Sequence, residues 1–234
     1  MGDGFCLCDN INCIKSERIA LFMITVTFGA YQGPVKTIRA IIFDLDGVLA
    51  FTDRFHYQAW KEICDERGWD FDSELNHRCR GVSRMGSLQI ILDHNQQQLS
   101  DEEKHSLADQ KNRQYRELLE NLTDDDLYPG VIDFLQCLKE RNVLMGVGSA
   151  SQNAVWILKK LQIHSYFDVV ISGADVTRSK PDPEVFQKAA STMGIHPFNC
   201  LVFEDAASGV EAALAAGMKC VGVGKPEDLA QAPA

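Results

Sequence analysis

Two aspartates, Asp44 and Asp46, directly follow an apolar run that ends at Phe43. A short hydrophobic run of this kind is typical of a buried parallel strand. Because side chains alternate along an extended chain, both carboxylates should point to one side while Leu45 points to the other. Such a pair suits Mg²⁺, which takes oxygen ligands, and it also suits a nucleophile beside a general acid and base. The simpler alternative is that both aspartates only cap and turn the chain.

Polar residues also follow three later apolar runs. Ser149 opens a stretch of small polar residues, Lys180 stands in a proline-bounded loop, and Glu204 with Asp205 forms a second acidic pair. Taken singly, Ser149 would be an ordinary helix cap, and so would the acidic pair. Ligands in open α/β sheets bind beyond the carboxyl ends of the strands, so we expect all of these groups in one crevice. Together they supply what phosphoryl transfer needs, because the protein's task there is positioning and charge neutralisation.

Short apolar runs alternate with amphipathic stretches along most of the chain. We predict strands at 38–43, 143–148, 167–172, 200–203 and 220–223, and helices at 131–141, 153–161, 184–193 and 208–216. This alternation is typical of βαβ units around a parallel sheet. Residues 53–126 interrupt it with helical signals alone, and a helical insert directly after the aspartate pair is well placed to be a lid.

The predicted fold class is therefore α/β, a Rossmann-like doubly wound parallel sheet with an inserted all-helical cap domain. We expect residues 37–52 and 127–234 to form the core and 53–126 the cap. Residues 1–36 fit neither part. Their apolar run at 19–30 is too short to span a bilayer, and acidic residues argue against a signal peptide, so we expect a non-essential leader.

The net charge indicates which classes of partner are unfavourable, and the cysteine content indicates the redox compartment. The 234 residues carry a net charge of −10, which argues against a nucleic-acid or membrane-surface partner. The eight cysteines form no CxxC pair, and no histidines stand at zinc-site spacing. We therefore expect a cytoplasmic protein with reduced thiols.

The order of these motifs resembles the haloacid dehalogenase superfamily of aspartate-nucleophile phosphotransferases. The core sequences specify only the superfamily. The cap sequence Arg80-Gly81-Val82-Ser83-Arg84 is similar to that of the β-phosphoglucomutase family, and the resemblance covers roughly residues 37–229. That family normally adds a further strand and helix after the strand expected at 220–223, and we expect both to be missing here.

The resemblance implies a role for each matched residue. Asp44 would attack phosphorus and become an aspartyl phosphate, while Asp46 would exchange protons with the sugar oxygens. Mg²⁺ would be bound by Asp44, the Asp46 carbonyl, Glu204 and Asp205. The implied substrate and phosphate site consists of Gly47, Thr52, His56, Trp60, Gly81, Val82, Ser83, Arg84, Lys111, Ser149, Ala150, Ser151, Asn153 and Lys180.

Within that set the implied roles differ. Ser149 and Lys180 would hold the transferring phosphate, whereas Arg84, Ser151 and Asn153 would hold the other one. Thr52 and His56 would help to place Asp46 when the cap closes, and Lys111 would line the cap face. Gln152 stands where these mutases carry lysine, so Arg84 should bear more of the second phosphate's charge.

Three functions are open at this point. The first is isomerisation of β-D-glucose 1-phosphate to glucose 6-phosphate through a bisphosphate intermediate. The second is a sugar phosphate phosphatase with the same core, and the third is a truncated product that binds without turnover. We expect a monomer whose partners are small-molecule sugar phosphates.

Overall fold

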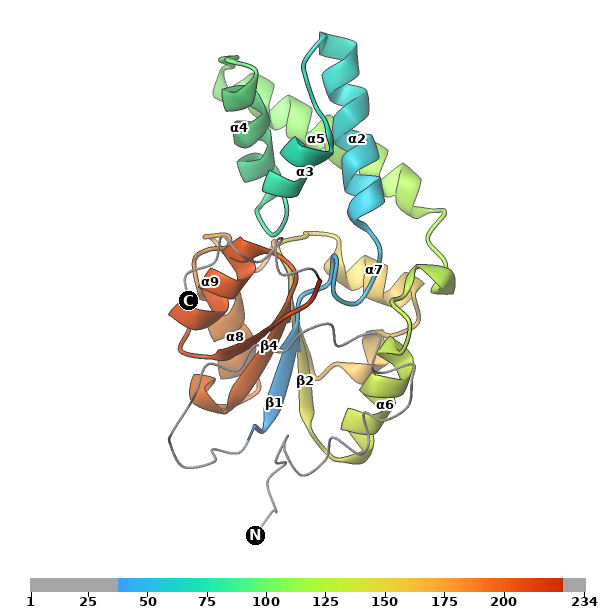
Figure 1. Cartoon of the computed structure of the whole chain (residues 1–234), viewed down its shortest axis with the longest axis vertical. Helices are drawn as coiled ribbons and strands as arrows, with labels where there is room; N and C mark the ends of the chain where they lie inside the picture. Colours follow the sequence, from blue (N-terminus) through green and yellow to red (C-terminus); the bar gives the residue numbers. More distant parts are fainter. Residues whose placement is uncertain (1–37, 225–234) are drawn as a thin grey trace.

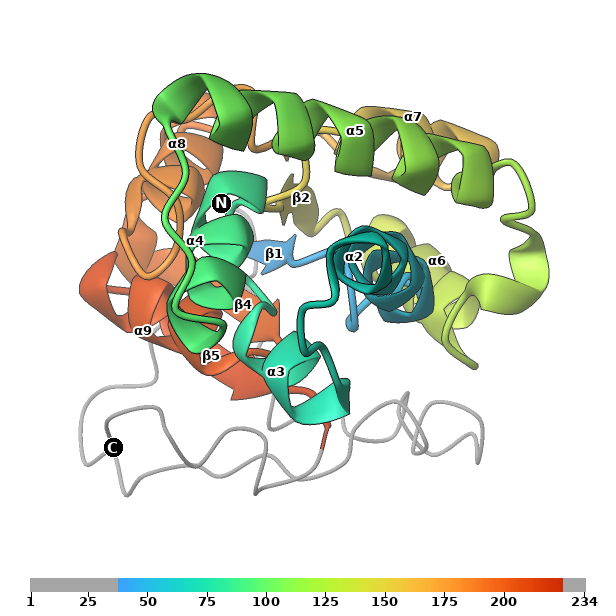
Figure 2. The ribbon, with the colours of Figure 1, turned by 90° about the horizontal axis from the view of Figure 1, so that it is seen from above.

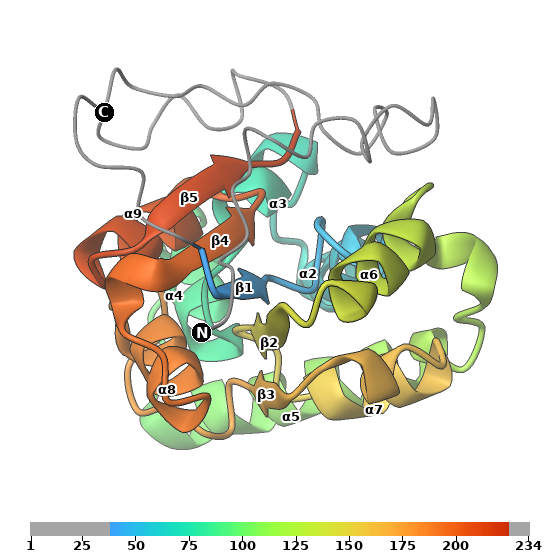
Figure 3. The ribbon, with the colours of Figure 1, turned by 90° about the horizontal axis from the view of Figure 1, so that it is seen from below.

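Five parallel strands form the centre of the molecule in a computed structural model that describes residues 38–224. The sheet has the order β3-β2-β1-β4-β5 (Figures 1 and 3). The strands are β1 (Ala40–Phe43), β2 (Leu144–Gly148), β3 (Val169–Ile171), β4 (Cys200–Glu204) and β5 (Lys219–Gly222). Each strand predicted from the sequence is present, and no end lies more than two residues from its predicted position. The α/β fold class is therefore confirmed.

The register of the sheet brings three strand ends to one level. Phe43 at the end of β1 lies opposite Val147 of β2 on one side and Phe203 of β4 on the other. The residues that follow β1, β2 and β4 therefore leave the sheet side by side, as expected for a crevice at the carboxyl ends of parallel strands.

Helices cover both faces of the sheet (Figure 3). One face packs against α6 (Val131–Glu140) and α7 (Ala154–Lys160), and the other packs against α8 (Glu184–Thr192) and α9 (Ala207–Ala215). The stacked rings of Phe43 and Phe203, with centroids 5.3 Å apart, lie in the apolar core between the sheet and helices α6 and α7. Among residues 38–224, short 3₁₀ turns connect elements at Asp124–Asp126, His164–Tyr166 and Pro197–Asn199.

Four helices form the cap above the sheet (Figures 1 and 2). They are α2 (Asp53–Arg67), α3 (Ser73–Arg78), α4 (Arg84–His94) and α5 (Asp101–Leu119). The cap has an apolar core of its own, with Trp60 and Ile63 from α2 among its members. Gly68 ends α2 at φ 65°, and Ser100 opens α5 with a complete capping box. The inserted helical cap is confirmed, while its division from the core after residues 52 and 126 stays a prediction.

The two connections between cap and core are bonded to each other. The Phe51 N–H donates to the Asp126 carbonyl at 2.7 Å, and Ala50 forms an antiparallel bridge with Leu127. The Phe51 ring also lies 3.6 Å from that of Tyr128, between centroids. The segments around residues 50–51 and 126–128 therefore form one short, hydrogen-bonded hinge between the cap and the core.

Two predictions lie outside the described residues, namely the leader at 1–36 and the missing elements beyond 224. Within residues 38–224, none of the helices combines the length and the apolar character needed to cross a membrane.

Candidate active site

Lys180 lies between two acidic side chains at the end of the sheet. Its Nζ donates to Asp44 Oδ1 at 2.5 Å and to Glu204 Oε1 at 2.6 Å. Lys180 and Glu204 are buried, and Asp44 is only 4% exposed. Burial raises the pKa of Asp44 to about 7 although Lys180 opposes the shift, and the neighbouring Glu204 adds to it. The two carboxylates in turn hold the pKa of Lys180 above its ordinary value in spite of burial. The ammonium is therefore a fixed cation beside Asp44.

Asp205 supplies a further carboxylate beside Gly47 of the aspartate loop. A Cβ added to Gly47, which has φ 86°, would come within 2.0 Å of Asp205 Oδ2. Burial raises the pKa of Asp205, and the charges of Glu204 and Asp44 raise it further. This excess of buried negative charge is the environment that a divalent cation neutralises.

The donor set fits a magnesium ion held by few protein ligands. Between residues 38 and 224 no three His, Cys, Asp or Glu side chains converge on one point. Glu204 uses Oε1 for Lys180 and Oε2 for the Ala206 N–H, so it is a poorer ligand than Asp205. Asp44, Asp205 and the Asp46 carbonyl remain as candidates. Mg²⁺ commonly keeps several waters and takes only one or two carboxylates, so this set suffices.

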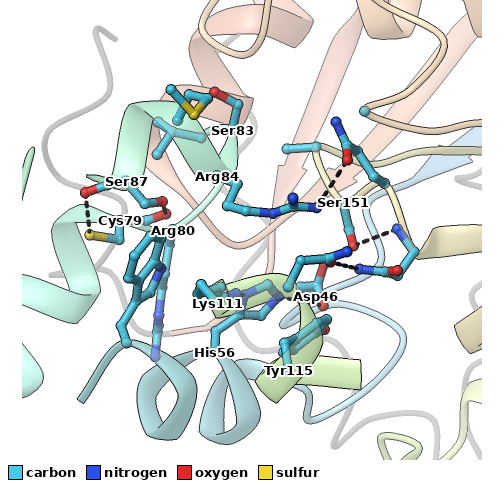
Figure 4. A pocket seen from close by; sticks show the side chains of 18 of the residues that line it. Asp46, His56, Cys79, Arg80, Ser83, Arg84, Ser87, Lys111, Tyr115 and Ser151 are labelled. Atoms are coloured by element: carbon cyan, nitrogen blue, oxygen red, sulfur yellow. Dashed lines mark hydrogen bonds and ion pairs between the residues drawn. The ribbon is translucent and has the colours of Figure 1, made fainter. Parts of the chain in front are cut away.

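Asp46 faces a different group of side chains. Thr52 Oγ1 donates to Asp46 Oδ1 at 2.5 Å, and His56 Nε2 lies 3.6 Å from the same oxygen. Burial works to raise the pKa of Asp46, but His56 and Thr52 outweigh it and the pKa is lowered. On the far side of the ring, Lys111 Nζ lies 2.7 Å from His56 Nδ1. Asp46 is therefore ionised and held in place by side chains from the hinge and the cap (Figure 4).

A cavity of about 350 Å³ lies between the cap and the carboxyl end of the sheet. Asp44 and Asp46 line it from the core. Arg84, at the first position of α4, reaches across it and donates from Nη2 to Gln152 Oε1 at 2.9 Å (Figure 4). A second contact joins the two parts where Asn153 Nδ2 donates to Asn112 Oδ1 at 3.0 Å. The cap is therefore closed on the core in this structure.

The cap loop before α4 rests directly on the core. Gly81 has φ 72°, and a Cβ there would lie 2.5 Å from Ser208 Oγ. Ser208 Oγ also donates to the Arg80 carbonyl at 3.3 Å, while the Arg80 guanidinium pairs with Asp53 at 2.8 Å. Asn76 Nδ2 donates to the same carboxylate at 3.2 Å. Asp53 thereby connects the first turn of α2 to the loop that carries Arg84.

Comparison with known proteins identifies the family to which this site belongs. Residues 38–217 match the family model described as haloacid dehalogenase-like hydrolase. The chain belongs to the haloacid dehalogenase-like hydrolases. The resemblance noted in the sequence is thus confirmed at the level of the family.

Named relatives in this family include both mutases and phosphatases. The chain is 38% identical to a β-phosphoglucomutase of Bacillus subtilis, over 82% of this chain and 86% of the relative. It is 34% identical to a fructose-1-phosphate phosphatase of Escherichia coli, over 78% of this chain and 95% of the relative. A crystal structure of β-phosphoglucomutase from Clostridium difficile superposes with a TM-score of 0.79 at 38% identity, covering 84% of this chain and 89% of that one.

The closed cap of this haloacid dehalogenase-like hydrolase brings most of the predicted site residues together. Those that line the cavity are Asp44, Asp46, His56, Trp60, Gly81, Val82, Ser83, Arg84, Lys111, Ala150, Ser151, Asn153 and Asp205. The other five do not line it: Gly47, Thr52, Ser149, Lys180 and Glu204. Thr52, Ser149, Lys180 and Glu204 are buried behind the lining, where they contact lining residues or the loops that carry them. Their direct contact with a phosphate stays a prediction.

Sequence reasoning missed several residues that the structure places at the cavity. They are Asp53, Asn76, Arg80, Gln152 as the partner of Arg84, Asn112 and Tyr115. For Tyr115 a signal was present, because it follows Lys111 by four residues and so shares its helix face. For Asp53 and Arg80, 27 residues apart on different elements, spacing carries no comparable signal.

Proposed function

We propose that this chain is a phosphomutase that interconverts β-D-glucose 1-phosphate and glucose 6-phosphate through a bisphosphate intermediate. The observation that carries the proposal is the position of Arg84. Its guanidinium extends from the cap to Gln152 across the cavity that Asp44 and Asp46 line. A cation held opposite the reacting carboxylates is what a second, non-transferring phosphate needs.

The chemistry assigned to the core divides between the two aspartates. An Asp44 carboxylate oxygen attacks phosphorus, the bond from phosphorus to the sugar oxygen breaks, and that oxygen takes a proton from Asp46. In the return step Asp46 removes the proton of the acceptor hydroxyl, which attacks the aspartyl phosphate and frees Asp44. The ionised Asp46 of this structure corresponds to the form that starts this second step.

The remaining polar groups neutralise the charge of the transferring phosphoryl group and position the residues around it. Lys180 offers fixed positive charge beside Asp44 while Glu204 keeps it in place. Mg²⁺ held by Asp44, Asp205 and the Asp46 carbonyl would supply further positive charge for the transferring phosphoryl group. Ser149 is buried and its Oγ accepts from the Ser151 N–H at 3.0 Å, so it shapes the loop that carries Ser151 and Asn153.

A mutase must also keep water away from the aspartyl phosphate. The two contacts between cap and core, Arg84 to Gln152 and Asn153 to Asn112, support a closed state that could do so. Both contacts use groups from the region assigned to the second phosphate. Closure and substrate recognition would thus depend on the same side chains.

The second candidate is a sugar phosphate phosphatase with the same core chemistry. It is favoured by the 34% identity to a fructose-1-phosphate phosphatase and by the uncharged Gln152 in the second phosphate region. In that case water would accept the phosphoryl group, and free phosphate would accumulate.

The test compares Arg84→Ala with Arg116→Ala, an exposed arginine on α5 that serves as the matched control. With β-glucose 1-phosphate and a bisphosphate primer, the wild type should form glucose 6-phosphate with little free phosphate. A charge-assisted contact is worth about 1.5–3 kcal/mol, so Arg84→Ala should lose roughly ten- to more than a hundredfold in kcat/KM. Phosphoryl transfer from acetyl phosphate, which has no second phosphate, should be spared.

Three outcomes would count against the mutase. Equal losses with both phosphoryl donors would mean that Arg84 supports the cap and not the second phosphate. Stoichiometric phosphate release by the wild type would favour the phosphatase. A wild-type protein that melts cooperatively but turns over neither substrate would favour the non-catalytic alternative.

A further inference from the structure

The phenol of Tyr115 is a buried polar group that the mechanism above does not use. Tyr115 is only 1% exposed, yet it belongs to the lining of the cavity. Its hydroxyl makes no well-formed hydrogen bond among the described residues, although the Asp46 carboxylate is close enough to raise its pKa. Leaving a buried hydroxyl unpaired is costly, and native proteins rarely do so without a reason.

Neighbouring side chains fix the direction of the ring. The His56 imidazole lies against it with centroids 4.1 Å apart and planes inclined by 30°. Lys111 Nζ lies 4.2 Å from the ring centroid, one helical turn earlier on α5. A cation over the ring face and an aromatic plane beside it restrict its rotation. The hydroxyl is thus held in place without being satisfied.

The hydroxyl lies beside Asp46 (Figure 4). Burial raises the pKa of Tyr115, and the charge of Asp46 raises it further, so the phenol keeps its proton. Asp46 Oδ1 already accepts from Thr52 at 2.5 Å. Tyr115 therefore offers a donor beside Asp46 at the cavity that a substrate oxygen could use.

We propose that the Tyr115 hydroxyl donates a hydrogen bond to a sugar oxygen of the substrate held next to Asp46. This assignment rests on the proposed function for its substrate class. A substrate oxygen that exchanges a proton with Asp46 must lie within about 3 Å of it, which brings that oxygen or its neighbour within reach of Tyr115. The phenol would then distinguish a sugar from inorganic phosphate, which has no oxygen to place there once its own site is filled.

The experiment removes only the hydroxyl, with Tyr115→Phe, in an Asp44→Asn background that prevents turnover. Tyr57→Phe is the matched control, because Tyr57 packs on Phe71 within the cap core. Affinities for β-glucose 1-phosphate and for inorganic phosphate are measured by calorimetry in the presence of Mg²⁺. Melting without ligand reports on folding, and no loss is expected since the hydroxyl has no well-formed hydrogen bond to lose.

We expect Tyr115→Phe to weaken β-glucose 1-phosphate about 2- to 13-fold, the range of one neutral hydrogen bond, and to leave phosphate affinity unchanged. An unchanged sugar phosphate affinity would overturn the assignment, and so would an equal loss for both ligands or the same loss in Tyr57→Phe. If the wild type shows no mutase activity but the selective loss is found, the mutase proposal fails while the Tyr115 assignment stands.

Discussion

Replacing Lys111 by methionine should stabilise the ligand-free protein near neutral pH while impairing its activity. Burial lowers the pKa of Lys111 to about 7 from its ordinary value of 10.5, and the nearby Arg84 lowers it further, although Asp46 opposes the shift. One pKa unit corresponds to about 1.4 kcal/mol. The buried ammonium therefore costs at most about 5 kcal/mol at pH 7 and below.

Contacts that methionine cannot make offset part of this gain. Loss of the 2.7 Å contact from Lys111 Nζ to His56 Nδ1 leaves a partly buried ring nitrogen unpaired, at about 1–3 kcal/mol. Loss of the ammonium over the Tyr115 ring removes about 0.5–2 kcal/mol. The expected net gain at pH 7 is about 1–2 kcal/mol. For a chain of this size that corresponds to a rise in Tm of roughly 2–8 °C.

The gain should depend on pH with a definite sign. Between pH 7 and 10.5 Lys111 is protonated in the unfolded chain but largely neutral in the folded one. The unfolded state then binds more protons, so wild-type stability rises with pH in this window. The variant lacks that contribution. The advantage of Lys111→Met should shrink above pH 7 and change sign near pH 10, where folded Lys111 is neutral and the lost contact to His56 is what remains.

Urea melts at pH 7, 8.5 and 10, without ligand, provide the measurement. Lys160→Met is the control, because Lys160 is a partly exposed lysine that pairs with Glu120 at 3.4 Å. A Lys111→Met protein that is less stable than the wild type at all three values, by a constant amount, would refute the reasoning. Lys111 would then be an ordinary charged lysine whose contacts outweigh its burial.

Three further outcomes are expected. Asp44→Asn should fold, since Lys180 keeps Glu204 as a partner, but form no phosphoenzyme, which acid-quenched labelling with a phosphoryl donor would reveal. Gly47→Ala should lose Mg²⁺ affinity on calorimetric titration, because its Cβ would strike Asp205, whereas Gly68→Ala, also at positive φ but with open space around it, should not. Glu184 accepts from the backbone of the loop before α8, which lowers its pKa to about 2. The stability that the ionised Glu184 carboxylate contributes is present above about pH 4.5 and is lost as the pH falls towards 2. The Tm difference between wild type and Glu184→Gln should therefore vanish near pH 2.

The sheet and the acidic motifs could be predicted because each depends on short-range pattern. An apolar run of four to six residues fixes a strand, and the polar residue that follows it must leave the sheet at its carboxyl end. Lys180 illustrates how far this extends. The sequence predicted a held lysine near the site, and the structure adds that it is buried between Asp44 and Glu204. The two carboxylates compensate the cost of burying the ammonium so deeply.

The rest of the site depends on how the cap sits over the core, which local pattern does not encode. Alternation along the strand predicted that Asp44 and Asp46 share a side. Both do line the cavity, but Asp44 contacts Lys180 while Asp46 contacts Thr52 and lies near His56. The pairing of Asn112 with Asn153 joins residues 41 positions apart on different parts of the fold. A separation of 41 residues matches no helical or strand period, so the sequence pattern cannot predict this contact.

The hydrogen bond from Arg84 to Gln152 limits what a bound phosphate could add. Arg84 already has an acceptor in Gln152, so an incoming phosphate exchanges one hydrogen bond for another. The binding energy gained at Arg84 is the difference in strength between its hydrogen bond to a phosphate dianion and its hydrogen bond to the neutral amide. Charge-assisted hydrogen bonds are about twice as strong as neutral ones. A ligand shifts a conformational equilibrium only by its differential affinity for the two states. With the neutral Gln152 as the acceptor to be replaced, a phosphate would gain about half the strength of a charge-assisted hydrogen bond at Arg84.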